Sequence, residues 1–162
     1  MKTTGITRRI DELGRIVIPK EIRHNLRIKK GELLEIFISD VDTISLKKHS
    51  LLKENHEYIE LLINTLSNLV NANIFLTDTD SIIVSNIEDM KNKKLKGTLK
   101  NNKESFYLTE NYKVELDYDT YNISPNGDLI GYLVIEYKNG KKDNIELIKF
   151  IISFLEKYFE FE

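Results

Sequence analysis

The chain has no cysteine and no long apolar run among its 162 residues. Without cysteine it has no disulfide framework, no thiolate nucleophile and no thiolate metal site. A membrane-spanning helix needs about 18 or more consecutive apolar residues, and no such run is present. The first residues also lack the apolar centre of a signal peptide. We therefore expect a cytoplasmic protein without membrane contact.

Patterns typical of enzymes and metal proteins are missing as well. No histidine has a second histidine at metal-ligand spacing; the three histidines are His24, His49 and His56. The acid pairs Asp78/Asp80 and Asp117/Asp119 lack the further oxygen ligands of a calcium loop, and no nucleophile accompanies them. No phosphate-binding glycine-rich loop occurs. The sequence predicts a non-enzyme without cofactor or metal, whose paired acids belong to turns and strand faces.

Charge is distributed unevenly along the chain. Residues 1–30 contain nine Lys/Arg against three Asp/Glu, although the net charge is −2. Residues 1–50 have 11 basic and 7 acidic side chains, whereas residues 51–162 have 13 and 19. A local basic excess on an acidic protein is typical of nucleic-acid contact, although composition alone leaves open a merely solvated face. The asymmetry predicts two parts with different roles.

The pattern of the first part is strand, strand, short helix, strand, strand. We expect strands at residues 6–10 and 16–18 around a turn at Gly14. Pro19 ends the second strand and opens a helix from Lys20 to about Leu26. Alternating apolar residues predict further strands at 34–38 and 43–47. About 50 residues are marginal for a monomeric core, and two interleaved copies would double the buried surface.

The second part reads as helix, mixed sheet, helix. Apolar residues at helical spacing predict helices over 51–70 and 145–159, the second capped by Asn144. The lysine-rich segment 87–103 is predicted to be helical, with Gly97 as a weak point. Turn residues occupy 124–128. The strands that we expect are residues 74–77, 82–85, 106–108, 112–116, 118–123 and 130–137.

The first part contains stretches that resemble a known family. They are Thr4-Gly-Ile6, Arg8-Arg-Ile-Asp-Glu-Leu-Gly-Arg15, Ile18-Pro-Lys-Glu-Ile-Arg23, Leu34-Glu-Ile-Phe37 and Ile44-Ser-Leu-Lys-Lys48. Together they make residues 1–50 resemble the AbrB-type transition-state regulators. The resemblance implies a mostly-β DNA-binding domain that forms a domain-swapped hairpin dimer on double-stranded DNA.

The resemblance also implies which side chains contact DNA. Arginines matching Arg8, Arg15 and Arg23 are implicated in DNA contact, whereas the position of His24 is often a further arginine. A histidine ring is mostly neutral at neutral pH, so His24 should contribute less. Arginine can bind phosphate or guanine through two parallel hydrogen bonds. The DNA-binding residues that we predict are Arg8, Arg9, Arg15, Lys20, Arg23 and His24.

The second part resembles another known domain. The stretch Ile123-Ser-Pro-Asn-Gly-Asp-Leu-Ile-Gly131 and the strand after it resemble the turn and late strand of a GAF sheet. The whole chain thereby resembles sporulation regulators in which an α+β GAF-like domain, here residues 51–162, follows the AbrB-type domain. This implies oligomerisation, as a dimer of dimers, and leaves open an unknown small-molecule ligand. The tyrosines of this part could line a pocket, but core and sheet packing is the favoured use of most; they are Tyr107, Tyr112, Tyr118, Tyr121, Tyr132 and Tyr137.

We therefore predict a sequence-specific transcription regulator of sporulation genes that forms a homotetramer and associates with the nucleoid. The alternative is an antitoxin-like interaction module of the swapped-hairpin superfamily. Such antitoxins usually carry a short disordered tail, whereas residues 51–162 are patterned for folding.

Overall fold

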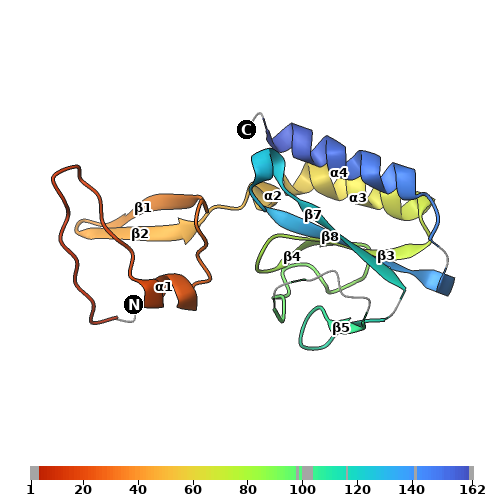
Figure 1. The fold of residues 1–162 in the computed structure, drawn as a ribbon, viewed down its shortest axis with the longest axis horizontal. Helices are drawn as coiled ribbons and strands as arrows, with labels where there is room; N and C mark the ends of the chain where they lie inside the picture. Colours follow the sequence, from red (N-terminus) through yellow and green to blue (C-terminus); the bar gives the residue numbers. More distant parts are fainter. Residues whose placement is uncertain (1–3, 98, 100–103, 116, 141, 161–162) are drawn as a thin grey trace. The chain divides into compact units, whose positions relative to one another are not determined.

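The computed structural model describes residues 4–97, 99, 104–115, 117–140 and 142–160. The chain divides into two compact parts, Met1–His49 and Ser50–Glu162, called unit 1 and unit 2 below. Figure 1 shows the elements of both. No helix among the described residues is long and apolar enough to cross a membrane.

Unit 1 contains a short helix and one antiparallel hairpin: α1 (Lys20–Asn25), β1 (Leu34–Asp40) and β2 (Thr43–Lys48). Across the hairpin, Ile36 pairs with Leu46 and Ile38 with Ile44, so these four side chains lie on one face. We call them the hairpin face. Ile38 is 84% exposed and the other three at least half exposed. No described residue of unit 1 covers this apolar surface.

The predicted strands at 6–10 and 16–18 are wrong for the single chain, because neither segment joins a sheet. Backbone hydrogen bonds close only the turn between them, from Asp11 N–H to Arg15 O (3.0 Å) and from Gly14 N–H to Asp11 O (2.9 Å). Gly14 has φ +76°, which glycine adopts readily. A strand needs a neighbour for its N–H and C=O groups, and no described strand of unit 1 provides one here.

Unit 2 is built on a four-stranded antiparallel sheet in the order β4-β3-β8-β7. Its helices are α2 (Leu51–Glu54), α3 (His56–Leu69) and α4 (Ile145–Phe159), with 3-10 turns η1 (Pro125–Gly127) and η2 (Lys138–Gly140). The sheet strands are β3 (Ala72–Thr77), β4 (Ile82–Ser85), β7 (Tyr118–Ile123) and β8 (Gly131–Tyr137), which confirms four of the predicted strands. A separate small hairpin, β5 (Phe106–Tyr107) and β6 (Lys113–Val114), replaces the two longer strands expected there; residue 116 lies outside the described residues.

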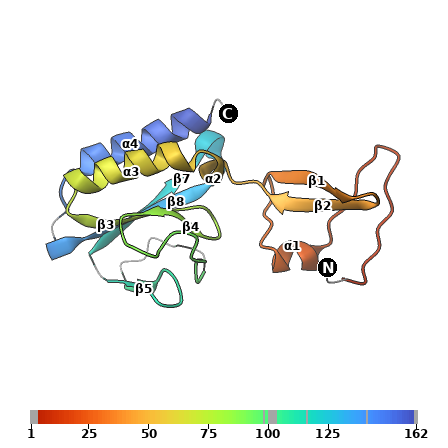
Figure 2. The same ribbon diagram turned by 180° about the vertical axis from the view of Figure 1, so that it is seen from behind.

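Both faces of this sheet are covered. The long helices α3 and α4 lie side by side on one face, and the segment between β4 and β7 lies on the other (Figures 1 and 2). The core on the helix side includes Ile59, Ile63, Leu133, Ile135, Ile148 and Leu155. The core on the opposite side includes Phe75, Met90, Leu95, Leu108, Tyr132 and Val134. Unit 2 thus has three layers, the two helices, the sheet and the loop segment, with one apolar core on each face of the sheet.

The two predicted helices of unit 2 differ in detail from the structure. The first is divided at Asn55 into α2 and α3. The Asn55 amide nitrogen donates to Leu51 O (3.1 Å), and its oxygen accepts from the Tyr158 hydroxyl (3.0 Å). The predicted cap is confirmed in position, because Asn144 is the N-cap residue of α4 and its carbonyl oxygen accepts Ile148 N–H (3.1 Å). Its side chain makes no cap hydrogen bond and instead donates to Leu69 O (2.8 Å).

The predicted helix over 87–103 is also wrong where the segment is described. Residues 87–97 and 99 form turns, bends and a single β-bridge; residues 98 and 100–103 lie outside the described residues. The reason lies in the apolar positions Met90, Leu95 and Leu99, which are all buried against the sheet. Their spacing of five and four residues does not fit one helical stripe at 3.6 residues per turn.

Gly131 allows two parts of unit 2 to pack closely. It opens β8 opposite Ile123, and a Cβ atom at this position would overlap the carbonyl oxygen of Thr77 and the side chain of Leu52. Only glycine fits between the strand β3 and the helix α2 without a shift of the backbone.

Candidate nucleic-acid interface

Arg8 and Arg9 lie in the irregular segment that precedes the first turn of unit 1. Both are exposed. The Arg8 guanidinium donates through Nη1 to the carbonyl oxygen of Thr7 (2.9 Å), which uses one of its five N–H groups. These two cations are therefore presented to solvent from a segment that joins no sheet.

The turn from Asp11 to Arg15 is organised by the Asp11 carboxylate. Its Oδ1 accepts the backbone N–H groups of Leu13 (3.0 Å) and Arg15 (2.8 Å). Its Oδ2 accepts Nε–H of Arg15 (2.8 Å). The backbone N–H of Arg15, and next its guanidinium, lower the pKa of Asp11 from the ordinary value. The side chain of Arg15 remains 70% exposed at the end of a defined turn.

Helix α1 carries the other three predicted residues. Pro19 is buried before the first turn, and its carbonyl oxygen accepts the N–H of Arg23 (3.0 Å). Lys20 opens the helix, and Arg23 and His24 follow in its last turn. Residues three and four apart are neighbours on a helix, so these three exposed side chains share one side of α1. Arg27, at φ 54°, follows the helix end.

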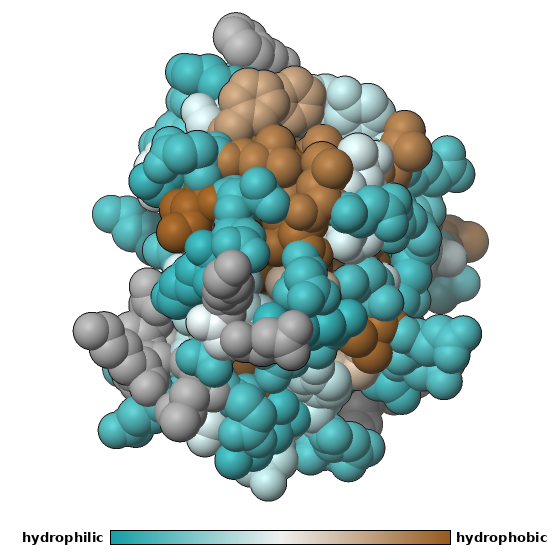
Figure 3. Space-filling view, turned by 90° about the vertical axis from the view of Figure 1, so that its right-hand side faces the viewer, coloured by the Kyte–Doolittle hydropathy of each residue, from teal (hydrophilic) through white to brown (hydrophobic). Residues whose placement is uncertain are grey.

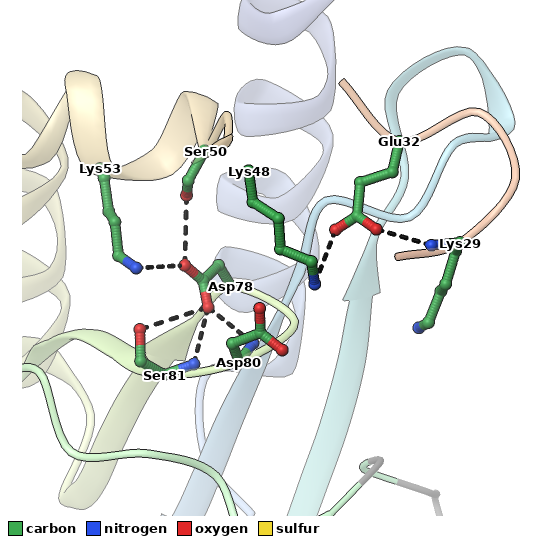
Figure 4. A network of polar contacts seen from close by, with 8 residues as sticks. All are labelled: Lys29, Glu32, Lys48, Ser50, Lys53, Asp78, Asp80 and Ser81. Atoms are coloured by element: carbon green, nitrogen blue, oxygen red, sulfur yellow. Dashed lines mark hydrogen bonds and ion pairs between the residues drawn. The ribbon is translucent and has the colours of Figure 1, made fainter. Parts of the chain in front are cut away.

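A carboxylate ties the chain after α1 to the hairpin. Glu32 accepts the backbone N–H of Lys29 (2.7 Å) through Oε2, and its Oε1 pairs with Lys48 Nζ (3.0 Å). Only 16% of the Glu32 side chain and 20% of the Lys48 side chain are exposed. Figure 4 shows this contact joining the turn after α1 to the end of β2. It limits how far α1 can move relative to the hairpin.

The structure thus presents the predicted residues in three sets: Arg8 and Arg9 before the turn, Arg15 on it, and the α1 side chains after it. Among the described residues, no hydrogen bond or ion pair joins one set to another. Sequence reasoning missed Asp11 as the organiser of Arg15. The signal was available, because an Asp side chain commonly binds backbone N–H groups two or more residues later in a glycine-containing turn.

Unit 2 contains polar groups that hold its own fold. Asp78 accepts the N–H groups of Asp80 and Ser81 through Oδ1 (both 2.7 Å), and its Oδ2 pairs with Lys53 (2.9 Å) and accepts from Ser50 (3.3 Å), as Figure 4 shows. Asp78 is 6% exposed. The interpretation of this acid as a turn residue is confirmed. Neither unit, taken alone, gathers three potential metal ligands among its described residues.

A second polar group lies on the sheet face away from α3 and α4. Glu136 accepts the Tyr112 hydroxyl (2.7 Å) and the Asn73 amide (2.8 Å). Burial, and next the hydrogen bond to Glu136, raise the pKa of Tyr112. Three buried side-chain oxygens, of Asn73, Thr77 and Thr120, have no hydrogen-bond partner among the described residues. They share this face, because their strand partners are Glu136, Tyr132 and Val134.

The tyrosines of unit 2 mainly pack. Tyr118, Tyr132 and Tyr137 are buried, and burial is the main cause that raises the pKa of each. Tyr107 is half exposed. Core and sheet packing, the favoured use of most of these residues, is therefore confirmed for these three.

The sequence is similar to known proteins both over unit 1 alone and over nearly the whole chain. Residues 7–50 match the family model described as antidote-toxin recognition MazE, bacterial antitoxin. Over nearly the whole chain the sequence is 35% identical to stage V sporulation protein T of Bacillus subtilis (strain 168), with 90% of each chain covered. A shorter alignment of 49 residues, 30% of this chain, is 53% identical to half of the transition state regulatory protein AbrB of the same organism.

Proposed function

The chain belongs to the family of stage V sporulation protein T, and from this premise we propose that it is a transcription regulator that binds specific double-stranded DNA in sporulation genes. The observation that carries the proposal is the exposed basic surface around α1 and the Asp11–Arg15 turn in unit 1. We assign it a nucleoid-associated, cytoplasmic role without enzymatic activity, in keeping with the regulator names of its relatives.

We assign the DNA contacts to two kinds of position. Arg15 and Arg23 leave ordered elements, a turn and a helix, so their guanidinium groups are suited to base edges. Arg8 and Arg9, from the irregular segment, and Lys20 and His24, on α1, are suited to phosphates, which set position without reading sequence. Asp11 holds Arg15 through Nε and leaves its remaining N–H groups for DNA.

Unit 1 is proposed to bind DNA as a domain-swapped hairpin dimer. The support is its exposed apolar surface, which includes the hairpin face as well as Leu13 (74%) and Val17 (73%). Monomeric soluble proteins rarely expose large contiguous apolar patches, so this degree of exposure supports a partner. A second copy could cover the hairpin face and supply strand neighbours for residues 6–10 and 16–18.

Unit 2, as a GAF-like domain, is proposed to join two such dimers into a tetramer. The outer faces of α3 and α4 carry Tyr58, Leu61, Leu69 and Phe150, each at least half exposed. Figure 3 shows hydrophobic side chains gathered in its upper half, the side on which these helices lie. Light scattering should give a tetramer for the full chain and an associated form for residues 51–162. A monomeric fragment would remove the basis for the tetramer.

The proposal extends to a small polar ligand in unit 2. Its support is the set of three buried oxygens without a partner, on Asn73, Thr77 and Thr120. Unpaired buried polar groups are costly, and a ligand with matching groups would repay that cost. A thermal-shift screen of small metabolites should find a compound that raises the melting temperature of the wild-type chain. The same compound should act less on a Thr77→Val/Thr120→Val variant, and equal shifts would place the ligand elsewhere.

DNA binding is tested by removing single arginines. Arg15→Ala and Arg23→Ala should each weaken binding while the melting temperature stays nearly unchanged, because both side chains are exposed. Loss of a base contact should cost about 1–3 kcal/mol and relax specificity, whereas loss of a phosphate contact should weaken all sequences alike. Fluorescence anisotropy on duplexes obtained by in vitro selection measures the binding affinity, and circular dichroism measures the melting temperature.

Lys47→Ala is the matched control, because it removes one exposed positive charge from β2 outside the predicted set. For the wild type, neutralisation of about six to eight phosphates should give a log–log salt slope of roughly −5 to −7. If Arg15→Ala binds as tightly as Lys47→Ala, Arg15 does not belong to the interface.

One observation favours a second candidate function. The family model for bacterial antitoxins matches residues 7–50, so the apolar surface of unit 1 could instead cover a toxin. The two functions differ in genomic context, because an antitoxin gene usually adjoins a toxin-sized reading frame. The likeness of 90% of the chain to a sporulation protein favours the regulator.

A further inference from the structure

The positive charge of unit 2 is concentrated in one segment. Residues 91–103 hold six of the thirteen lysines found after residue 50, and no acid. The remainder of that part has seven lysines against nineteen acids. Four of the six belong to described residues and are exposed; they are Lys91, Lys93, Lys94 and Lys96. We call these four side chains the lysine row.

Buried apolar side chains anchor the segment that carries the lysine row. Met90, Leu95 and Leu99 are interspersed among the lysines and are 8%, 3% and 7% exposed. They pack with Phe75 and Val134 on the sheet face away from α3 and α4, where Figure 1 shows the segment. The apolar side chains of this segment are buried, and the side chains of the four lysines remain exposed to solvent.

Backbone hydrogen bonds fix the same segment. Asn92 N–H donates to Ile82 O (2.8 Å), and Ile82 N–H donates in return to Lys93 O (2.9 Å). Farther along, Leu95 N–H donates to Asp80 O and Lys96 N–H to Leu108 O, at 2.8 and 3.0 Å. The lysine row is therefore displayed from an ordered loop and not from a free chain.

Two of these cations form no ion pair with any residue that the structure describes. Lys91 pairs with Glu60 (2.8 Å), and Lys96 Nζ lies 4.3 Å from the centre of the Tyr107 ring. No described acidic side chain forms an ion pair with Lys93 or Lys94. Their positive potential is thus directed outward from a unit that is otherwise strongly acidic.

The type of cation indicates the kind of partner. All five arginines of the chain lie in unit 1, and unit 2 contains lysine alone. Lysine is a point charge on a flexible stem, which attracts phosphate but lacks the planar fork that reads guanine. A lysine row therefore fits a polyanion that is held by charge and not by sequence.

We propose that the lysine row is a second DNA contact, which binds phosphates independently of sequence. It rests on the proposed function, because DNA held by unit 1 raises the local concentration of phosphate around unit 2 of the same chain. Duplex DNA carries one charge per about 1.7 Å and releases counterions when lysines replace them. The acidic surface of a second copy of the chain would carry a lower density of negative charge than DNA, so DNA is the partner that we propose.

The test compares two triple variants of the full chain. Lys93→Gln/Lys94→Gln/Lys96→Gln removes three charges from the row. Lys138→Gln/Lys149→Gln/Lys157→Gln removes three exposed charges elsewhere in unit 2. Fluorescence anisotropy over a range of salt concentrations is recorded with a duplex obtained by selection and with one of random sequence.

The row variant should lose about five- to tenfold in affinity for both duplexes alike, and its log–log salt slope should become shallower by about 2 to 3. The control should stay within about twofold of wild type. Equal losses in both variants, or none in the row variant, overturn the inference. So does unchanged DNA affinity with a smaller oligomer in light scattering, which would place the row against another copy. A wild type that binds neither duplex overturns the proposed function as well.

Discussion

The two units use apolar residues in opposite ways. Among the described residues, every large hydrophobic side chain that is fully buried belongs to unit 2. Of the eighteen that are exposed, thirteen belong to unit 1, from Ile6 to Leu46. Unit 2 closes its core within one chain, because helices and a loop segment cover both faces of its sheet. Unit 1 has the strand-like pattern of a sheet protein, but its described residues form no second layer that would cover it.

The comparison teaches that an apolar sequence pattern specifies which face of an element is to be buried. It does not specify whether the residues that bury this face belong to the same chain. In unit 2 the cover follows in the same chain, as α3 and α4. In unit 1 the described residues provide none, and in the proposed dimer the cover would come from a second copy. The charges follow the same division, with arginine confined to unit 1.

The largest effect is expected from a polar side chain on the hairpin face. Ile38→Asn should dissociate the proposed dimer and weaken DNA binding about 100-fold, because each of two copies would bury an amide without a partner. In the single chain Ile38 is 84% exposed, so unit 1 without a partner would tolerate the change. Analytical ultracentrifugation and anisotropy measure the two quantities.

The control is Val41→Asn in the turn between β1 and β2, where the side chain is 99% exposed. It should leave both measurements near wild type, since asparagine suits a turn. If the two variants had the same oligomeric state and the same DNA affinity, the contrast between the two units would be wrong. Unit 1 would then be stable with its apolar face in water.

The sequence predicted the elements that complete themselves inside one chain. Alternation and helical spacing placed β3, β4, β7, β8 and the two long helices, because their burial partners lie in the same unit. The segments 6–10 and 16–18 failed as strands because strand formation depends on a neighbour that the single chain does not supply. The segment 87–97 failed as a helix because Met90 and Leu95 pack on the sheet, and such tertiary contacts override local propensity.

For the candidate DNA-binding site, too, one part could be predicted from the sequence and another could not. Composition identified the basic stretch, and the resemblance to AbrB-type regulators singled out Arg8, Arg15 and Arg23 within it. Neither could show that the Asp11 carboxylate holds Arg15 through both its backbone and its guanidinium, because that depends on the conformation of the turn. The contact of these residues with DNA stays a prediction.

An intermediate effect is expected from Gly131→Ala, which sharpens the comparison from the side of unit 2. The added methyl group would overlap the Thr77 carbonyl oxygen, which belongs to the backbone and cannot turn away. We expect a loss of about 1–3 kcal/mol in the free energy of unfolding, as for other overpacked sites. Gly97→Ala is the control, because nothing lies within 4 Å of its added methyl group. Thermal and urea unfolding of the full chain should separate the two; equal stability would show that unit 2 is packed less tightly than described.

The smallest effect is expected from Asp11→Ala. Loss of the carboxylate removes the acceptor of two backbone N–H groups and of the Arg15 guanidinium, so DNA binding should weaken a few-fold through a looser turn. Asp42→Ala removes an equal, exposed charge from another turn and should not weaken binding. Stronger binding by Asp11→Ala would mean that the carboxylate competes with DNA for Arg15.

The pKa of Asp11 gives this prediction a pH dependence. Because it is lowered from the ordinary value of 3.8, the carboxylate stabilises the turn above that value, and this stabilisation is lost as the pH falls through the lowered pKa. The difference between wild type and Asp11→Ala should therefore persist at neutral and mildly acidic pH. A difference that vanishes near neutral pH would assign the effect to another group.

The bare hairpin face also has a consequence for timing in the cell. If unit 1 is completed only by a second copy, then at low abundance the amount of DNA-competent protein rises with the square of the number of chains. Halving the supply of new chains would reduce the active form about fourfold in that range. Such a regulator would act late while it accumulates and fade early while it is diluted by growth, without any separate signal.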